Sequence, residues 1–188
     1  MKRLSLALSL ILSLAAHGAA AEVPLGDDGL HKPEWLKNSF KVLAEDNAEA
    51  AEAGRHLLLL IEQRGCIYCA RLHNEILTDP RIDRLIRDRF DVVQLDLFGG
   101  TEITDTDGEQ LSEKRAAAKW GVAVTPTLML MPNDLPPEQD AARAAMAVLP
   151  GVLEADQLLA VLEWAAGGGP QTGRDIRQVL SGPVPAQP

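Results

Sequence analysis

Residues Leu57 to Leu77 read LLLLIEQRGCIYCARLHNEIL, and this stretch decides the fold. It opens with five aliphatic residues, an apolar run of strand length. It closes with a segment in which Leu72, Ile76 and Leu77 have helical spacing. Between the two stand Cys66 and Cys69, the only cysteines of the 188 residues. A buried strand that leads into a helix, with C-x-x-C at the junction, predicts a redox-active dithiol.

The position of the two cysteines assigns their chemical roles. The start of a helix carries free N–H groups and the positive end of the helix dipole, which stabilise an anion. A thiolate placed there has its pKa lowered from about 8.5 to between about 3.5 and 7.5. Cys66 is therefore expected to attack, and Cys69, one turn later, to resolve. The alternatives are a structural disulfide, half of a zinc site, or chance spacing.

The first residues predict export. Two cations in Met1-Lys2-Arg3 precede the uncharged segment 4–16, and Ala19-Ala20-Ala21 has the pattern of a signal-peptide cleavage site. The apolar segment is too short for a membrane-spanning helix. We therefore expect a signal peptide at 1–21, cleaved near Ala21, and a periplasmic protein. An uncleaved anchor is the alternative.

Composition excludes several classes of partner. Loss of Lys2 and Arg3 with the signal peptide moves the formal net charge from −9 to −11. A chain this acidic is repelled by nucleic acid and by an anionic membrane, which argues against either as its partner. The remaining residues suit one domain, expected to be a monomer, with a flexible leader at 22–33, a domain at 34–168 and a flexible tail at 169–188. An exported chain with a single C-x-x-C has no disulfide framework, which favours working cysteines over structural ones.

Further elements follow from periodicity and from helix caps. Pro33 is expected to begin a helix that runs to about Ala53, with Trp35, Leu36, Phe40 and Leu43 on its apolar face. Asp79-Pro80 and Ser112 mark two later helix starts. Segment 91–98 alternates as a strand, and 99–110 reads as an acidic loop. An apolar strand ends at Met131, segment 141–149 suits either strand or helix, and a last helix covers 153–166.

Thr125-Pro126 opens the strand that ends at Met131. Proline is tolerated at the first position of a strand, so the dipeptide alone is a weak signal. Downstream of a C-x-x-C it becomes a strong one.

Together these residues resemble the thioredoxin superfamily over about Pro33 to Ala166, and within it the SoxW-type periplasmic thioredoxins of bacterial sulfur oxidation. The closer resemblance is carried by Glu62-Gln63-x-Gly65-Cys66-x-Tyr68-Cys69, Phe90-Asp91-Val92-Val93-Gln94-Leu95, Glu102-x-x-x-Asp105-x-Asp107-Gly108, Leu111-Ser112-Glu113-Lys114, Lys119-Trp120-Gly121-Val122 and Thr125-Pro126-Thr127.

The resemblance implies a thioredoxin-like α/β fold, a central mixed sheet flanked by helices with a helix ahead of the sheet. It also implies a thiol–disulfide oxidoreductase that forms a Cys66–Cys69 disulfide. Pro126 is then expected to be cis and to border the cysteines, while the backbone at Thr125 and Pro126 receives the substrate chain. No cofactor and no metal are implied.

The sequence departs from ordinary thioredoxins around the cysteines. Arg64-Gly65 stands where Trp usually precedes the first cysteine, and Ile67-Tyr68 replaces Gly-Pro between the two. Leu60 occupies the place of the buried aspartate that assists the resolving cysteine. The redox potential of thioredoxin is therefore not transferable.

Four side chains near the cysteines are candidate accessory residues. Glu62 is the nearest carboxylate that could replace the missing aspartate. Arg64 could stabilise the Cys66 thiolate or be a solvated loop charge, and Tyr68 could contact a partner or cover the site. His73 could relay protons or bind a metal, but an exposed helix histidine is favoured. His31 and His56 carry no readable signal.

Three functions remain open. The leading one is an exported reductant of protein disulfides, with an oxidised cysteine protein such as a Sox sulfur carrier as client. The family resemblance adds a membrane electron donor of the DsbD or CcdA kind. The second is a periplasmic disulfide oxidase or isomerase, or a cytochrome c maturation thioredoxin. The third is a copper carrier that uses Cys66, Cys69 and His73, since thiolates and imidazole suit copper.

Overall fold

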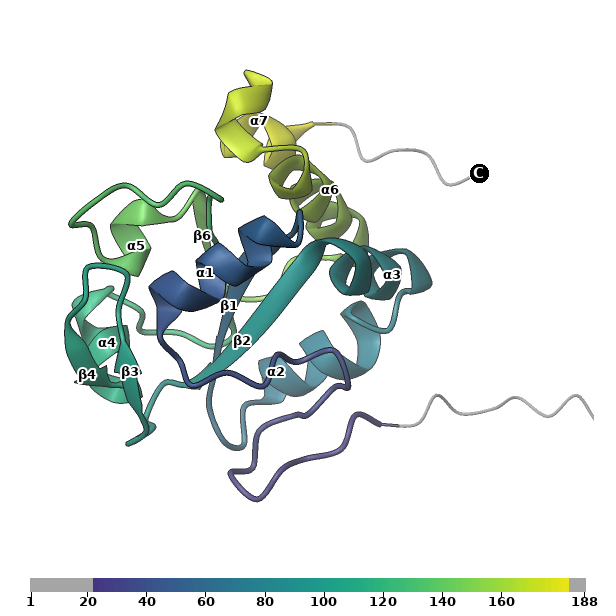
Figure 1. The fold of residues 1–188 in the computed structure, drawn as a ribbon. Helices are drawn as coiled ribbons and strands as arrows, with labels where there is room; N and C mark the ends of the chain where they lie inside the picture. Colours follow the sequence, from purple (N-terminus) through teal and green to yellow (C-terminus); the bar gives the residue numbers. More distant parts are fainter. Residues whose placement is uncertain (1–21, 183–188) are drawn as a thin grey trace, which may run out of the picture.

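The leucine run forms β1 (His56–Glu62), a strand buried along its whole length. It lies inside a four-stranded sheet of order β2-β1-β5-β6 (Figure 1). β1 runs parallel to β2 (Phe90–Asp96) and antiparallel to β5 (Thr127–Leu130), and β5 runs antiparallel to β6 (Ala147–Pro150). This computed structural model describes residues 22–182, so the expected signal peptide at 1–21 and residues 183–188 lie outside the described residues.

Each face of the sheet has its own apolar core, because successive strand residues point to opposite sides. Leu58, Leu60 and Val92 belong to the core beneath α3 (Pro80–Arg89) and α6 (Ala155–Ala166). Leu57, Leu59 and Val93 belong to the core beneath α1 (Leu43–Glu52) and α4 (Glu113–Lys119). The predicted mixed sheet flanked by helices is confirmed. Within residues 22–182, no helix combines the length and the apolar character needed to cross a membrane.

The helix that carries the cysteines changes its geometry along its length. It begins as α2 (Ile67–Arg71) and continues as a π-helical segment, η1 (Leu72–Ile76). The backbone N–H of Leu77 donates to the carbonyl of Leu72 at 2.8 Å, a bond that spans five residues instead of four. The wider turn shifts every following side chain around the helix axis relative to an α-helix, and such turns are frequent at functional sites.

The predicted helix starting at Pro33 is wrong, because the helix ahead of the sheet begins only at Leu43. Residues 34–42 run alongside the outer edge of β2 instead, where Leu36 bridges to Val92 and the Lys37 N–H donates to the Val92 carbonyl at 2.8 Å. Pairing with an open strand edge satisfies backbone groups that would otherwise be free. Phe40, expected on a buried helix face, is 98% exposed.

The acidic segment 99–110 is also more ordered than a plain loop. It contains β3 (Glu102–Thr104), which pairs with β4 (Gln110–Ser112) in a small antiparallel hairpin. Its Asp105 is fully buried and accepts hydrogen bonds from the indole N–H of Trp120 at 2.9 Å and from the Ala141 N–H at 3.0 Å. The carboxylate thus joins the hairpin to α4 and to α5 (Ala141–Ala144), a tertiary role that charge content alone does not reveal.

The remaining elements are a short helix that comes just before β6 and two segments that follow α6. Segment 141–149 contains both alternatives that the sequence left open, a helix, α5 (Ala141–Ala144), and the start of β6. The expected caps are present, with Asp79 accepting from the Arg81 N–H and Ser112 from the Arg115 N–H. Residues beyond Gly168 form η2 (Gly169–Thr172) and α7 (Ile176–Ser181), which packs against α6.

Candidate functional site

The two cysteines lie where β1 leads into α2, and a disulfide joins them with their Cα atoms 5.2 Å apart. Cys66 is the N-cap residue of α2, and its Sγ accepts a hydrogen bond from the backbone N–H of Cys69 at 3.0 Å. Cys66 is 9% exposed and Cys69 only 1%. The sulfur at the helix start is therefore the one that a second molecule can reach.

The Thr125–Pro126 peptide lies against this disulfide and is cis. Thr125 Oγ1 lies 3.3 Å from Cys66 Sγ, and the Thr125 carbonyl oxygen lies 3.5 Å from the same sulfur. The turn is held on its other side, where the Gly151 N–H at the end of β6 donates to the Pro126 carbonyl at 2.8 Å. Sheet pairing of β5 with β1 and β6 thus places the hydroxyl of Thr125 on the accessible sulfur.

A pocket of about 590 Å³ opens beside Cys66 and extends between the start of α2 and the turn ahead of β5. Its wall includes three apolar side chains that are unusually exposed, Ile67 at 74%, Tyr68 at 58% and Val124 at 51%. Water-exposed apolar side chains grouped around a reactive atom are typical of a surface that contacts another molecule. Tyr68 therefore lies at the rim of the pocket and leaves Cys66 open.

His73 does not have the exposed position that its sequence context favoured. It is fully buried, and its Nε2 lies 2.9 and 3.0 Å from the two carboxylate oxygens of Glu62, which is fully buried as well. The prediction assumed α-helical spacing, whereas His73 stands in the π-helical turn η1. Among the described residues, no hydrogen bond joins Glu62 to either cysteine, so its predicted role as an aid to Cys69 stays a prediction.

The leader, residues 22–33, covers this buried pair. The ring of His31 stacks on that of His73 with centroids 4.7 Å apart and an angle of 13° between the planes. Burial, and then the neighbouring His73, lower the pKa of His31. Sequence reasoning missed His31, because it lies in a Pro/Gly/Asp-rich segment far from the cysteines and has no periodic pattern around it.

Arg64 also contacts the leader. Its side chain is exposed, and Nε donates to the carbonyl oxygen of Asp28 at 3.1 Å. Cys66, Cys69 and His73, the ligands that the copper-carrier alternative requires, are not brought together within residues 22–182. The set of metal-ligating side chains that does converge there is His31, Glu62 and His73.

The geometry supports one chemistry, the exchange of thiols and disulfides. In the Cys66–Cys69 disulfide, the sulfur of Cys66 lies at a helix N-terminus beside the Thr125 hydroxyl. The sulfur of Cys69 is buried. In the reduced form the first thiolate can form a mixed disulfide and the second can break it, without any cofactor.

Comparison with known proteins agrees with this site. The family model of a thioredoxin-like domain matches residues 43–166. A thioredoxin-fold protein from Helicobacter pylori has 23% sequence identity, covers 68% of this chain and 80% of its own, and gives a TM-score of 0.54. A thioredoxin from Thermus thermophilus has 21% identity, covers 69% of this chain and 88% of its own, and gives a TM-score of 0.53. The comparison with curated proteins found no match.

The two solved structures share the fold, and the family model spans β1, the cysteine pair, the cis proline and α6. The chain therefore belongs to the thioredoxin-like domain family and is a thiol–disulfide oxidoreductase.

Proposed function

We propose that this oxidoreductase is exported and works as a reductant of protein disulfides in the periplasm. Two features support the proposal: the signal-peptide pattern of residues 1–21, and the open pocket beside Cys66 with its apolar rim. The observation that carries it is the contact of Cys66 Sγ with Thr125 Oγ1 at the mouth of that pocket. A folded polypeptide with an exposed disulfide can reach the sulfur there, whereas Cys69 remains covered.

The proposed reaction has two exchanges. The Cys66 thiolate attacks one sulfur of the client disulfide, the client S–S bond breaks, and the other client sulfur leaves as a thiolate that takes up a proton. The Cys69 thiolate then attacks Cys66 Sγ, which breaks the mixed disulfide and releases the second client thiol. Two electrons pass to the client, and the Cys66–Cys69 disulfide is formed.

The oxidised enzyme must then be reduced again. Cytosolic NADPH does not reach an exported protein, so the electrons are supplied by a dithiol of a membrane relay of the DsbD or CcdA kind. Resemblance to the SoxW-type thioredoxins suggests the client, an exported protein with an oxidised cysteine such as the sulfur carrier of a Sox complex.

Equilibration with glutathione buffers tests the direction of electron flow. Reduction potentials of known dithiol proteins run from about −270 mV for thioredoxin to about −120 mV for DsbA, and 30 mV corresponds to about 1.4 kcal/mol. A reductant is expected near the thioredoxin end of this range. A potential near that of DsbA would replace the proposal with an oxidase.

Trapping identifies the client. Cys69→Ser removes the resolving thiol, so mixed disulfides should accumulate on Cys66 and be identifiable by mass spectrometry. The double variant Cys66→Ser/Cys69→Ser is the matched control and should trap nothing. Recovery of a Sox sulfur carrier supports the proposal. Recovery of cytochrome-maturation proteins indicates haem-ligation chemistry, and recovery of many unrelated exported proteins indicates a general reductase or isomerase.

A further inference from the structure

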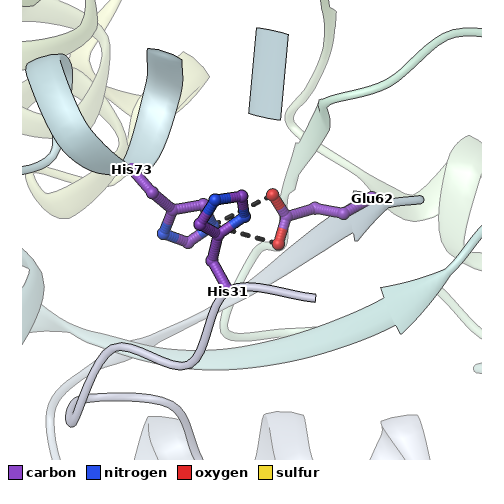
Figure 2. Close-up of side chains that lie close together, drawn as sticks. All are labelled: His31, Glu62 and His73. Atoms are coloured by element: carbon purple, nitrogen blue, oxygen red, sulfur yellow. Dashed lines mark hydrogen bonds and ion pairs between the residues drawn. The ribbon is translucent and has the colours of Figure 1, made fainter. Parts of the chain in front are cut away.

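Three metal-ligating side chains meet where the leader packs against the end of β1 and η1. His31 comes from the leader, Glu62 from the last position of β1, and His73 from η1 (Figure 2). One ligand atom from each lies within 4.8 Å of the other two. Segments far apart in the sequence thus deliver two imidazoles and one carboxylate to a single point.

The carboxylate at this point is held in a fixed orientation. Glu62 accepts from the side-chain amide of Gln94 at 2.5 Å, and the same amide donates to the His31 carbonyl at 2.8 Å. Gln94 Oε1 in turn accepts from Lys32 Nζ at 2.6 Å. One buried amide therefore orients the carboxylate and fastens the backbone of His31 beside it. Outer hydrogen bonds of this kind are what fix the ligands of protein metal sites.

The two histidine rings lie next to the buried carboxylate. Figure 2 shows both rings on the same side of the Glu62 carboxylate, the His31 ring stacked over that of His73. His73 Nδ1 is buried and has no hydrogen-bond partner within residues 22–182. A buried nitrogen without a partner calls for an explanation. Within residues 22–182, no lysine or arginine pairs with the buried Glu62 carboxyl group, and a cation bound at this point would face it directly.

We propose that His31, Glu62 and His73 bind one zinc ion, and that the ion fastens the leader to the helix that carries the cysteines. Two histidines and one glutamate are an established donor set for zinc, with a fourth position left for water. Imidazole nitrogen disfavours magnesium and calcium, which prefer oxygen ligands. The proposal is independent of the direction in which the dithiol transfers electrons.

The distances allow this with a small adjustment. Zinc–nitrogen and zinc–oxygen bonds of about 2.0–2.2 Å place tetrahedral ligand atoms about 3.3 Å apart. His73 Nε2 and the Glu62 oxygens are already at 2.9 and 3.0 Å. The remaining approach, about 1.5 Å at most, falls to His31 on the leader, whose ring must also turn out of its stack on His73 so that a nitrogen lone pair points at the ion. The ion then takes the place of the His73–Glu62 hydrogen bond.

The site has a path to solvent. A pocket of about 510 Å³ is lined by His73 together with Trp35, Lys32 and Val23. The pocket touches His73 but neither Glu62 nor His31, and both His73 and Glu62 are fully buried, so an ion enters when the leader that carries His31 shifts. The cysteines do not compete while they are joined in the disulfide, because a disulfide provides no thiolate.

Metal titration of the oxidised, tag-free, chelator-treated protein tests the site. Co²⁺ is followed by its visible absorption, and Zn²⁺ by calorimetry and by displacement of Co²⁺. We expect one equivalent of metal. His31→Ala should weaken zinc binding at least about tenfold, and Glu62→Gln should do the same. The matched control is Glu34→Gln, which removes a carboxylate that is 90% exposed and three positions from His31.

Hydrogen exchange gives a readout that ordinary surface binding would not move. The Lys32 N–H donates to the Pro24 carbonyl and the Gly26 N–H to the Leu30 carbonyl, both inside the leader. Zinc should slow exchange of these amides in the wild type and in Glu34→Gln, but not in His31→Ala. His31 stands on the leader and in neither apolar core, so His31→Ala should fold. This variant therefore tests zinc binding even if Glu62→Gln fails to fold. No bound metal, equal affinity in His31→Ala, or unchanged leader exchange would overturn the proposal.

Discussion

Thr125 Oγ1 lies 3.3 Å from Cys66 Sγ, although 59 positions separate the two residues. In the reduced protein this hydroxyl can donate to the Cys66 thiolate, and a hydrogen bond to a charged group contributes about 1.5–3 kcal/mol. Thr125→Val keeps the shape and removes the donor. We expect it to raise the pKa of the Cys66 thiol, because the thiolate loses a hydrogen-bond donor. The pH dependence of the Cys66 alkylation rate measures the change.

Thr125→Ser is the control for that experiment, because it keeps the hydroxyl and loses only a methyl group. Its alkylation profile should match the wild type. If Thr125→Val also matches the wild type, the hydroxyl does not stabilise the thiolate.

The two cysteines should differ strongly in reactivity. Cys66 is the N-cap of α2 and the more exposed of the pair, while Cys69 is 1% exposed. Only the first sulfur has the helix N-terminus in front of it, where a thiolate is stabilised. Iodoacetamide at neutral pH should alkylate Cys66 at least about tenfold faster in the reduced protein. Peptide mass spectrometry reads the rates, and equal rates or the reverse order would contradict the assignment of attacking and resolving thiol.

Local signals predicted the cysteine pair and much of the sheet. The apolar run before Cys66 and the helix caps Asp79 and Ser112 depend only on residues a few positions away in the chain. The strand and the helix starts that they specify can therefore be read directly from the sequence. The same holds for the position of Cys66 at a helix start. The Thr125–Pro126 geometry came from resemblance, because a cis bond has no local signature of its own.

The surroundings of Glu62 could not be predicted in this way. His31 reaches the site because its backbone is held by Gln94, 63 positions away. His73 faces inward from a π-helical turn, which α-helical spacing does not anticipate. The composition of the leader resembles that of a mobile segment, whereas its order in the structure depends on partners from β2 and η1.

Asp105 should be a major contributor to stability. Its buried carboxylate pairs with Lys119 Nζ at 2.9 Å and accepts from the Trp120 indole N–H at 2.9 Å. Asp105→Asn replaces one carboxylate oxygen, an acceptor, with an NH2 group, which is a donor. The protein then has donors facing each other where the oxygen accepted before. A buried donor that loses its acceptor costs about 1–3 kcal/mol. Two backbone or indole N–H groups, of Ala141 and Trp120, donate to Asp105, so we expect a loss of about 3 kcal/mol in the free energy of unfolding, measured with urea.

Asp107→Asn is the matched control, because Asp107 binds the same Lys119 at 2.6 Å but is 23% exposed. A solvent-exposed pair contributes about 0–1 kcal/mol, so this variant should change stability by less than about 1 kcal/mol. Similar losses in the two variants would show that burial of Asp105 is unimportant.

His56 is the first residue of β1. It is buried beside Phe90, with ring centroids 6.1 Å apart, and burial is the main cause that lowers its pKa from the ordinary value of 6.5. The folded state therefore binds a proton at His56 less readily than the unfolded state does. As the pH falls through 6.5, the unfolded chain takes up a proton that the folded protein resists. His56 should thus lower stability in acid and leave it unaffected well above pH 6.5.

His56→Gln removes this titration while keeping a polar side chain of similar length. The wild type should lose stability more steeply than the variant between pH 7.5 and 5.0, by at most about 1.4 kcal/mol for each pH unit. Urea unfolding of both proteins across that range measures the difference, and any constant cost of the substitution cancels when slopes are compared. Parallel curves would mean that His56 titrates alike in the folded and unfolded states, and that its burial at the start of β1 does not oppose protonation.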